Sequence, residues 1–161
     1  MKTIICIEGV SAVGKTCTVK NVRKLLNPKE VKPETGFTVE EFKEESKDGD
    51  FYAILSHKET GKKIGLSSSG DPYSNQGEYL EYLAKESCDI ILCASRTKGD
   101  TTSNVYEIAE MSDYEIIKTR NFRGDAFPNK ASSDRELSRE DLNSEFAQAV
   151  VRLINLLIKK S

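Results

Sequence analysis

Residues 9–16 read Gly-Val-Ser-Ala-Val-Gly-Lys-Thr, and this G-x-x-x-x-G-K-T pattern comes directly after the apolar run of residues 3–7. Its two glycines, Gly9 and Gly14, let the backbone turn tightly and leave its amides uncovered. The N–H groups of residues 11–16 can then point into one hollow of the size of an anion. The pattern therefore predicts a strand, a phosphate-binding turn and a helix in that order.

The side chains of this loop indicate a nucleotide ligand. Lys15 supplies a fixed positive charge for the β- and γ-phosphates, and the Thr16 hydroxyl can ligate Mg²⁺. The helix that follows adds the partial positive charge of its N-terminus. ATP or another nucleoside triphosphate, together with Mg²⁺, is therefore the expected cofactor, and a glycine-containing turn without a ligand is the alternative. The candidate cofactor contacts are Gly9, Ser11, Ala12, Val13, Gly14, Lys15, Thr16 and Cys17.

Composition narrows the class of protein. The chain has 161 residues, which predicts a single domain over residues 1–161, and its net charge of −2 gives no strong signal for nucleic acid. No apolar stretch approaches the roughly 18–20 residues that cross a bilayer, so no membrane partner is expected. A cleaved signal peptide would remove the loop, and the four cysteines contain no C-x-x-C pair. These features predict a cytoplasmic protein with reduced thiols.

Strand and helix patterns alternate along the chain and predict an α/β fold, a three-layer α/β/α sandwich with a mainly parallel sheet. The turn at residues 59–62 predicts an antiparallel β-hairpin within it. The acidic run from Glu40 to Glu45 is expected on one solvated helix face, and Ser138 with Asp141 predicts a capping box. Strands are expected at 2–8, 51–56, 63–68, 89–94 and 114–118, and helices at 14–26, 38–47, 74–87, 101–111 and 138–160.

Two further side chains are candidates for the chemistry. Asp71 ends an apolar strand, and the carboxyl ends of parallel strands line the ligand crevice of open sheets. It would bind Mg²⁺ through water or polarise an attacking hydroxyl, but Gly-Asp-Pro is also an ordinary turn sequence. Arg96 follows the strand at residues 89–94 and would clamp a phosphoryl oxygen or stabilise charge in transfer. A surface ion pair is the alternative for Arg96.

On Gly9, Gly14, Lys15 and Thr16 the chain resembles the P-loop nucleoside triphosphate hydrolase superfamily. Its small size, early loop and arginine-bearing late loop are similar to those of the nucleoside and nucleotide kinase branch. The resemblance implies a sheet with the loop at its centre, Lys15 on the β- and γ-phosphates and Thr16 on Mg²⁺. It also implies that Arg120, after the last strand, lies near the base of the nucleotide. The stretch that follows, with Lys130, Arg135 and Arg139, would form a mobile cover that brings arginines to the phosphates, and a solvated basic loop is the alternative.

These observations predict an ATP-dependent phosphotransferase of small-kinase type, which moves the γ-phosphoryl of Mg-ATP to a small-molecule acceptor such as a nucleoside or nucleotide. Lys15, Asp71 and Arg96 would be catalytic, and Thr16 and Asp71 would be the metal ligands. The acceptor is expected near residues 27–50. The alternative is a nucleotide-dependent switch that hydrolyses slowly and acts through a protein partner. The acceptor, the preferred base and the formation of a homodimer stay open.

Overall fold

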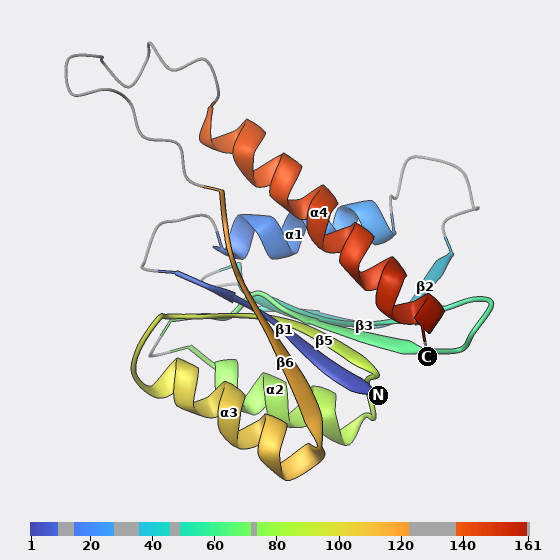
Figure 1. Cartoon of the computed structure of the whole chain (residues 1–161), viewed down its shortest axis with the longest axis horizontal. Coiled ribbons are helices and arrows are strands. Elements are labelled where there is room, and N and C mark those ends of the chain that lie inside the picture. Colours follow the sequence, from blue (N-terminus) through green and yellow to red (C-terminus); the bar gives the residue numbers. More distant parts are fainter. Residues whose placement is uncertain (10–14, 28–35, 46–48, 72–73, 123–137, 161) are drawn as a thin grey trace.

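The computed structural model describes residues 1–9, 15–27, 36–45, 49–71, 74–122 and 138–160 (Figure 1). Strands and helices alternate over most of this length, which confirms the predicted α/β class. In chain order the elements are β1 (Lys2–Glu8), α1 (Lys15–Leu26), β2 (Phe37–Glu44), β3 (Phe51–His57), β4 (Lys63–Ser67), α2 (Gln76–Lys85), β5 (Ile90–Ser95), α3 (Asp100–Ser112), β6 (Tyr114–Arg120) and α4 (Arg139–Lys160).

The six strands form one mixed sheet in the order β2-β3-β4-β5-β1-β6. Parallel pairing joins β4 to β5, β5 to β1 and β1 to β6, whereas β2 and β3 pair antiparallel with their neighbours. The pair β3–β4 is the predicted hairpin. Because β1 lies between β5 and β6, the segment that follows β1 leaves from an interior strand of the sheet.

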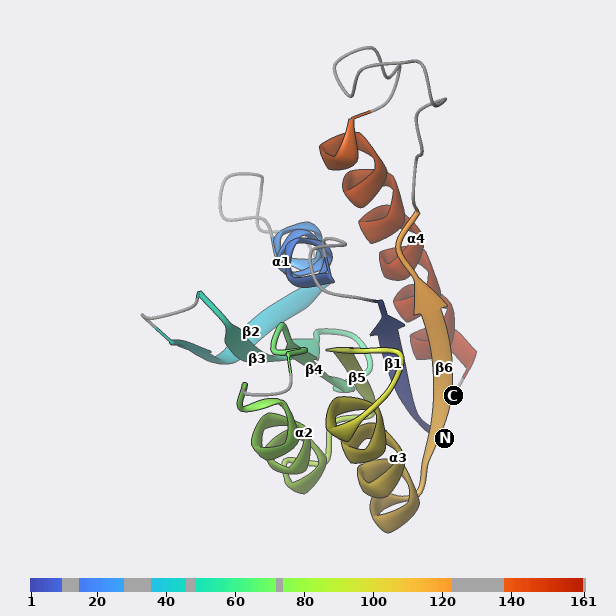
Figure 2. The same cartoon turned by 90° about the vertical axis from the view of Figure 1, so that its left-hand side faces the viewer.

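Burial on both faces explains the continuous apolar sequence of β1. Ile5 and Ile7 pack into a core with side chains of α1 and α4, whereas Ile4 and Cys6 pack into a second core with side chains of α2 and α3. Figure 2 shows α1 and α4 on one face of the sheet and α2 and α3 on the other. Helices on both faces therefore hold β1, and with it the start of the glycine-containing loop, inside the fold.

Helix α4 begins with the predicted capping box. The Ser138 hydroxyl accepts a hydrogen bond from the Asp141 N–H at 3.0 Å, and the Asp141 carboxylate accepts one from the Ser138 N–H at 2.9 Å. Each group satisfies a donor that the first turn of a helix leaves unpaired. The buried face of α4 includes Asn143, a polar residue within an otherwise apolar stripe.

The helix expected over residues 38–47 is wrong, because residues 38–44 belong to the edge strand β2. It pairs antiparallel with β3, and the register shifts between Val39 and Glu41. Side chains such as Val39 and Phe42 favour a pleated strand, and hydrogen bonds to β3 are available along the whole segment. Its acidic run had indicated a helix face, but charged side chains are equally suited to an exposed sheet edge.

Two of the acidic side chains in this region tie the edge of the sheet to α2 rather than facing only solvent. The Glu41 carboxylate accepts hydrogen bonds from the hydroxyls of Tyr52 on β3 and Tyr82 on α2, each at 2.7 Å. Glu45, which follows β2, accepts one from the Tyr79 hydroxyl of α2 at 2.5 Å. The tyrosine rings pack against one another, with centroids 5.0 Å apart for Tyr52 and Tyr79. This Tyr–Glu cluster fixes β2 in the sheet.

Two expectations from composition concern membranes and thiols. Among the helices in the described residues, none combines the length and the apolar character that a bilayer crossing requires. The four cysteines are free, and Cys6, Cys88 and Cys93 are buried in the core while Cys17 is exposed.

The Glu41 carboxylate makes the stability of the fold depend on pH. Hydrogen bonds from Tyr82 and Tyr52 lower the pKa of Glu41 below its ordinary value of 4.5. A lowered pKa in the folded state stabilises the protein above the ordinary value, and this contribution is lost as the pH falls through the lowered pKa. We expect Glu41→Gln to melt at a lower temperature than the wild type at neutral pH, with a difference that shrinks below about pH 4.5.

Thermal unfolding followed by circular dichroism over this pH range measures the effect. Glu44→Gln, which changes an exposed carboxylate on the same strand, is the matched control. A melting difference for Glu41→Gln that stays constant across the range would contradict the role given to this carboxylate.

Candidate active site

The parallel strands β1 and β5 end next to each other, so their carboxyl ends lie side by side at one end of the sheet. Glu8 lies opposite Ser95 in the register, and the Gly9 N–H donates to the Ser95 carbonyl at 3.1 Å. Helix α1 begins nearby at Lys15. Of the predicted loop contacts, Ser11, Ala12, Val13 and Gly14 lie outside the described residues, so the structure places the two ends of the loop, at Gly9 and Lys15.

Lys15 lies where these segments meet, and its side chain is buried. Its Nζ donates to the Gly9 carbonyl at 2.8 Å and to the Ser95 carbonyl at 3.1 Å. Burial lowers the pKa of Lys15, and the Asp71 charge acts in the opposite direction. The ammonium group is thus held at the carboxyl ends of two strands, close to the first turn of α1.

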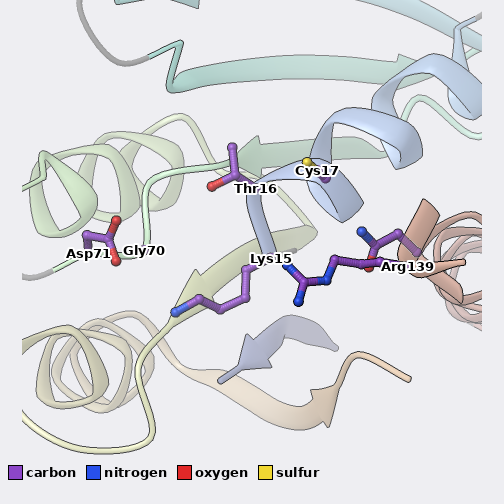
Figure 3. Close-up of a pocket in the computed structure, with 7 residues that line it drawn as sticks. Lys15, Thr16, Cys17, Gly70, Asp71 and Arg139 are labelled. Atoms are coloured by element: carbon purple, nitrogen blue, oxygen red, sulfur yellow. The ribbon is translucent and has the colours of Figure 1, made fainter. Parts of the chain in front are cut away.

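A cavity of about 300 Å³ opens beside Lys15. Three separate segments contribute to it: the first turn of α1, the chain after β4, and the first turns of α4. Figure 3 shows Arg139 extending from α4 toward Lys15, with Asp71 on the other side of Lys15 in this view. The described residues that line the cavity are Lys15, Thr16, Cys17, Gly70, Asp71, Arg139 and Asn143.

Thr16 and Asp71 line the same cavity as Lys15. The Thr16 hydroxyl donates to the Ser68 carbonyl at 3.3 Å, which places α1 against the end of β4. The Asp71 side chain is 68% exposed, and its carbonyl accepts from the N–H and the hydroxyl of Ser74. Asp71 therefore has the hydrogen bonds of a turn residue and also faces the cavity, and its role on Mg²⁺ stays a prediction.

Arg96 does not line the cavity itself but contacts Asp71, which does. Its Nη2 lies 3.4 Å from the Asp71 Oδ1, and Arg96 is not among the described residues that line the cavity. The Arg96 N–H donates to the Thr101 hydroxyl at 3.0 Å, and the Arg96 carbonyl accepts from the Thr102 hydroxyl. Its backbone is thus fixed on both sides, while its guanidinium forms the ion pair that was the alternative for this residue.

Arg120 is not among the described residues that line the cavity. It ends β6 opposite Glu8 in the register and is exposed, and Glu8 forms its ion pair with Lys118 instead, at 2.9 Å. The implied contact of Arg120 with a base therefore has no geometric support here. The neighbouring residue Asn121 is closer to the site, because its amide donates to Thr18 on α1 and to Asn143 on α4.

Helix α4 contributes two residues to the cavity, and of these the sequence had indicated Arg139, as part of a basic cover for the phosphates, but not Asn143. Arg139 and Asn143 are four residues apart, so they lie on one face of the helix. Asn143 is 6% exposed and accepts from the Asn121 amide at 3.1 Å. The signal that could have indicated this contact is the placement of an asparagine on the apolar face of the helix, where a buried amide needs a polar partner.

The cavity offers oxygen ligands of the kind that Mg²⁺ binds. Among the described residues, no group of three or more histidine, cysteine, aspartate or glutamate side chains is placed to hold a metal ion. The Thr16 hydroxyl and the Asp71 carboxylate are hard oxygen donors that line the same space. Such a donor set suits Mg²⁺, which usually takes one or two protein oxygens together with phosphate oxygens and water.

Comparison with known proteins gives little to add to this geometry. No protein-family model and no curated protein matches the chain. Among solved structures, it is similar to one described as EndoMS in apo form, with 20% sequence identity and a TM-score of 0.32 over 65% of this chain. The match covers 47% of that chain, so the present chain spans about half its length. A TM-score this low assigns neither a fold nor a function.

Gly70, in the wall of the cavity, lies directly against Ala94 of β5. A Cβ at this position would lie 2.8 Å from the Cβ of Ala94 and 3.2 Å from the Ala94 carbonyl carbon. We expect Gly70→Ala to lower the free energy of unfolding by about 1–3 kcal/mol, because β5 cannot move away without disturbing the core. Denaturant unfolding measures this change.

The double variant with Ala94→Gly provides the control for this prediction. Removal of the Ala94 Cβ relieves the closer of the two contacts, so Gly70→Ala should destabilise the Ala94→Gly protein less than the wild type. Equal destabilisation in the two backgrounds would show that the contact with Ala94 is not what requires a glycine here.

Proposed function

We propose that this chain is a P-loop protein with a three-layer α/β/α arrangement that binds a Mg²⁺-nucleoside triphosphate and acts as a small-kinase-type phosphotransferase. The observation that carries the proposal is the position of Lys15. Its buried ammonium group lies at the start of α1 and at the ends of β1 and β5, beside a cavity that it shares with Thr16 and Asp71.

The electrostatics of Lys15 support a phosphate ligand. A buried ammonium group is unfavourable unless it is paired, and two neutral carbonyls compensate only part of the lost hydration. An ammonium has three N–H donors, and two of them are directed at Gly9 and Ser95, so the third can bind a phosphate oxygen. The N-terminus of α1 favours the same ligand, because its amide groups carry partial positive charge.

Four residues have distinct parts in the proposed transfer. Lys15 would orient the β- and γ-phosphates, and Thr16 with Asp71 would hold Mg²⁺. When bound, Mg²⁺ supplies charge neutralisation for the transferred phosphoryl group. Arg96, held beside Asp71, would stabilise the negative charge that develops on the phosphoryl oxygens.

We place the acceptor on the side of the cavity lined by Asp71, next to which Arg96 lies. The phosphoryl group transferred must face the residues that stabilise its charge, so the acceptor hydroxyl would approach there. The earlier expectation placed the acceptor near residues 27–50. The part of that segment in β2 is separated from β1 by three strands, which favours the Asp71 side over β2 itself.

A turnover assay tests the proposal directly. Mg-ATP is supplied with a panel of nucleosides, nucleoside monophosphates and phosphorylated metabolites, and phosphorylated products are identified by mass spectrometry. A large rate increase with one acceptor would support a kinase and name its substrate. Tight binding with slow hydrolysis that no acceptor accelerates would favour the switch. Absence of ATP binding would refute both.

Lys15→Ala should weaken Mg-ATP binding by about 10- to 100-fold, since the loop loses its fixed charge and a hydrogen bond to a charged group contributes about 1.5–3 kcal/mol. Isothermal titration calorimetry measures the dissociation constant. Lys24→Ala removes an exposed charge from the last turn of the same helix and is the matched control. An unchanged affinity for Lys15→Ala would rule out this lysine as a phosphate ligand.

Asp71→Asn should separate binding from chemistry. The amide has the shape of the carboxylate but not its charge, so we expect affinity for ATP to change less than about threefold while Mg²⁺-dependent turnover falls at least about 100-fold. The Mg²⁺ concentration for half-maximal turnover should rise in parallel. Asp113→Asn, an exposed position after α3, is the control. Full turnover in Asp71→Asn would leave this residue with its turn role alone.

A further inference from the structure

Gln76, the first residue of α2, is buried, with 1% of its surface exposed, and its amide uses both its nitrogen and its oxygen. The Nε2 donates to the Ala94 carbonyl at 3.2 Å and to the Thr101 carbonyl at 2.9 Å. The Oε1 accepts from the Asn104 amide at 3.0 Å. One side chain thus connects the start of α2 to the end of β5 and to the first turns of α3.

The segment that Gln76 holds is the one that carries Arg96. Thr101, whose carbonyl accepts from Gln76, uses its hydroxyl to accept from the Arg96 N–H. The Thr102 hydroxyl donates to the Arg96 carbonyl. The backbone of Arg96 is therefore hydrogen-bonded to the first turn of α3, and Gln76 connects that turn to α2 by a further hydrogen bond.

Asp71, the other partner of the ion pair, belongs to a segment that also packs close to Gln76. Gly70, next to Asp71, packs against Ala94, and the Ala94 carbonyl accepts from Gln76. Ser74, two residues before Gln76, donates twice to the Asp71 carbonyl. Gln76 thus lies between the two segments whose side chains meet at the Arg96–Asp71 contact of 3.4 Å.

We propose that Gln76 is a positioning residue that holds the Arg96 guanidinium at its working distance from Asp71 and the phosphoryl group. This inference rests on the proposed function, and it assigns Gln76 no contact with substrate. Displacement of a charged group by about 1 Å is enough to reduce catalysis by about 100-fold, so a rigid support for Arg96 has a direct effect on turnover. Binding of the nucleotide depends mainly on Lys15 and the loop, and is not affected.

Gln76→Glu is the test variant. It keeps the size of the side chain and the acceptor for Asn104, but it replaces the two donated hydrogen bonds by repulsion from two carbonyls. We expect Mg-ATP turnover, with the acceptor found in the panel assay, to fall at least about tenfold. The dissociation constant for Mg-ATP should change less than about threefold. If Gln76→Glu does not fold, Gln76→Met removes the same hydrogen bonds without a charge.

A double-variant cycle distinguishes positioning from general destabilisation. If Gln76 acts through Arg96, the substitution should lower turnover of the Arg96→Ala protein by less than about twofold. Hydrogen exchange at the Arg96 amide gives a readout independent of turnover, and we expect faster exchange in the Gln76 variant. Tyr114→Phe is the matched control, because it removes one buried hydrogen bond, to the Cys88 carbonyl, at the other end of β5.

The outcomes separate this proposal from the proposed function. An equal loss of turnover with and without Arg96, or unchanged exchange at its amide, would overturn the role of Gln76 alone. So would full turnover in the Gln76 variants. A wild-type protein that binds no Mg-ATP and phosphorylates no acceptor would overturn the proposed function and, with it, the catalytic role of Gln76.

Discussion

The parallel pairing of β1 with β5 is the constraint on which the candidate site depends. It sets Ile7 opposite Ala94 and Glu8 opposite Ser95, so the two strands end side by side at one edge of the sheet. The same pairing continues to Gly9, whose N–H donates to the Ser95 carbonyl, so the two carbonyls that accept from Lys15 lie next to each other. Helix α1 begins at Lys15, so its first turn lies at the ends of these two strands.

The cavity combines groups of opposite charge from three parts of the chain. Lys15 and Arg139 are contributed by helices on the same face of the sheet, and Asp71 comes from the chain after β4. A ligand with several negative charges and a bound cation would match this arrangement, with its phosphates near Lys15 and its cation near Asp71. Arg96 lies beside Asp71, where it partly balances the charge of the carboxylate.

The parts of the fold that follow from local patterns could be predicted, and those that depend on packing could not. A continuous apolar run such as Ile90–Ala94 is diagnostic of a buried parallel strand, and the Ser138–Asp141 box marks a helix start by itself. The strand β2 was missed because its charges obscured a pattern of β-branched and aromatic residues, and its pairing with β3 is a tertiary effect.

The same distinction applies to the candidate site. Lys15, Thr16 and Asp71 were predicted because a loop pattern and strand ends locate them, and they line one cavity. Arg139 was predicted only as one residue of a basic cover, and Asn143 was not predicted, because its place depends on how α4 packs across α1 and on the Asn121 bridge between these helices. The periodicity of residues 138–160 does not by itself specify how α4 packs across α1. The contact of Arg120 with a nucleotide stays a prediction.

The edge strand β2 has a consequence for self-association. An unpaired strand edge is a template on which another chain can add a strand, and long, flat, apolar edges are prone to aggregation. Here the bulge after Val39 interrupts the regular spacing of the outer N–H and C=O groups, and exposed charges such as Glu40, Lys43 and Glu44 line the strand. An incoming strand would have to desolvate these charges and match an irregular ladder. The irregular register and the charges together make the β2 edge a poor template for the addition of another strand.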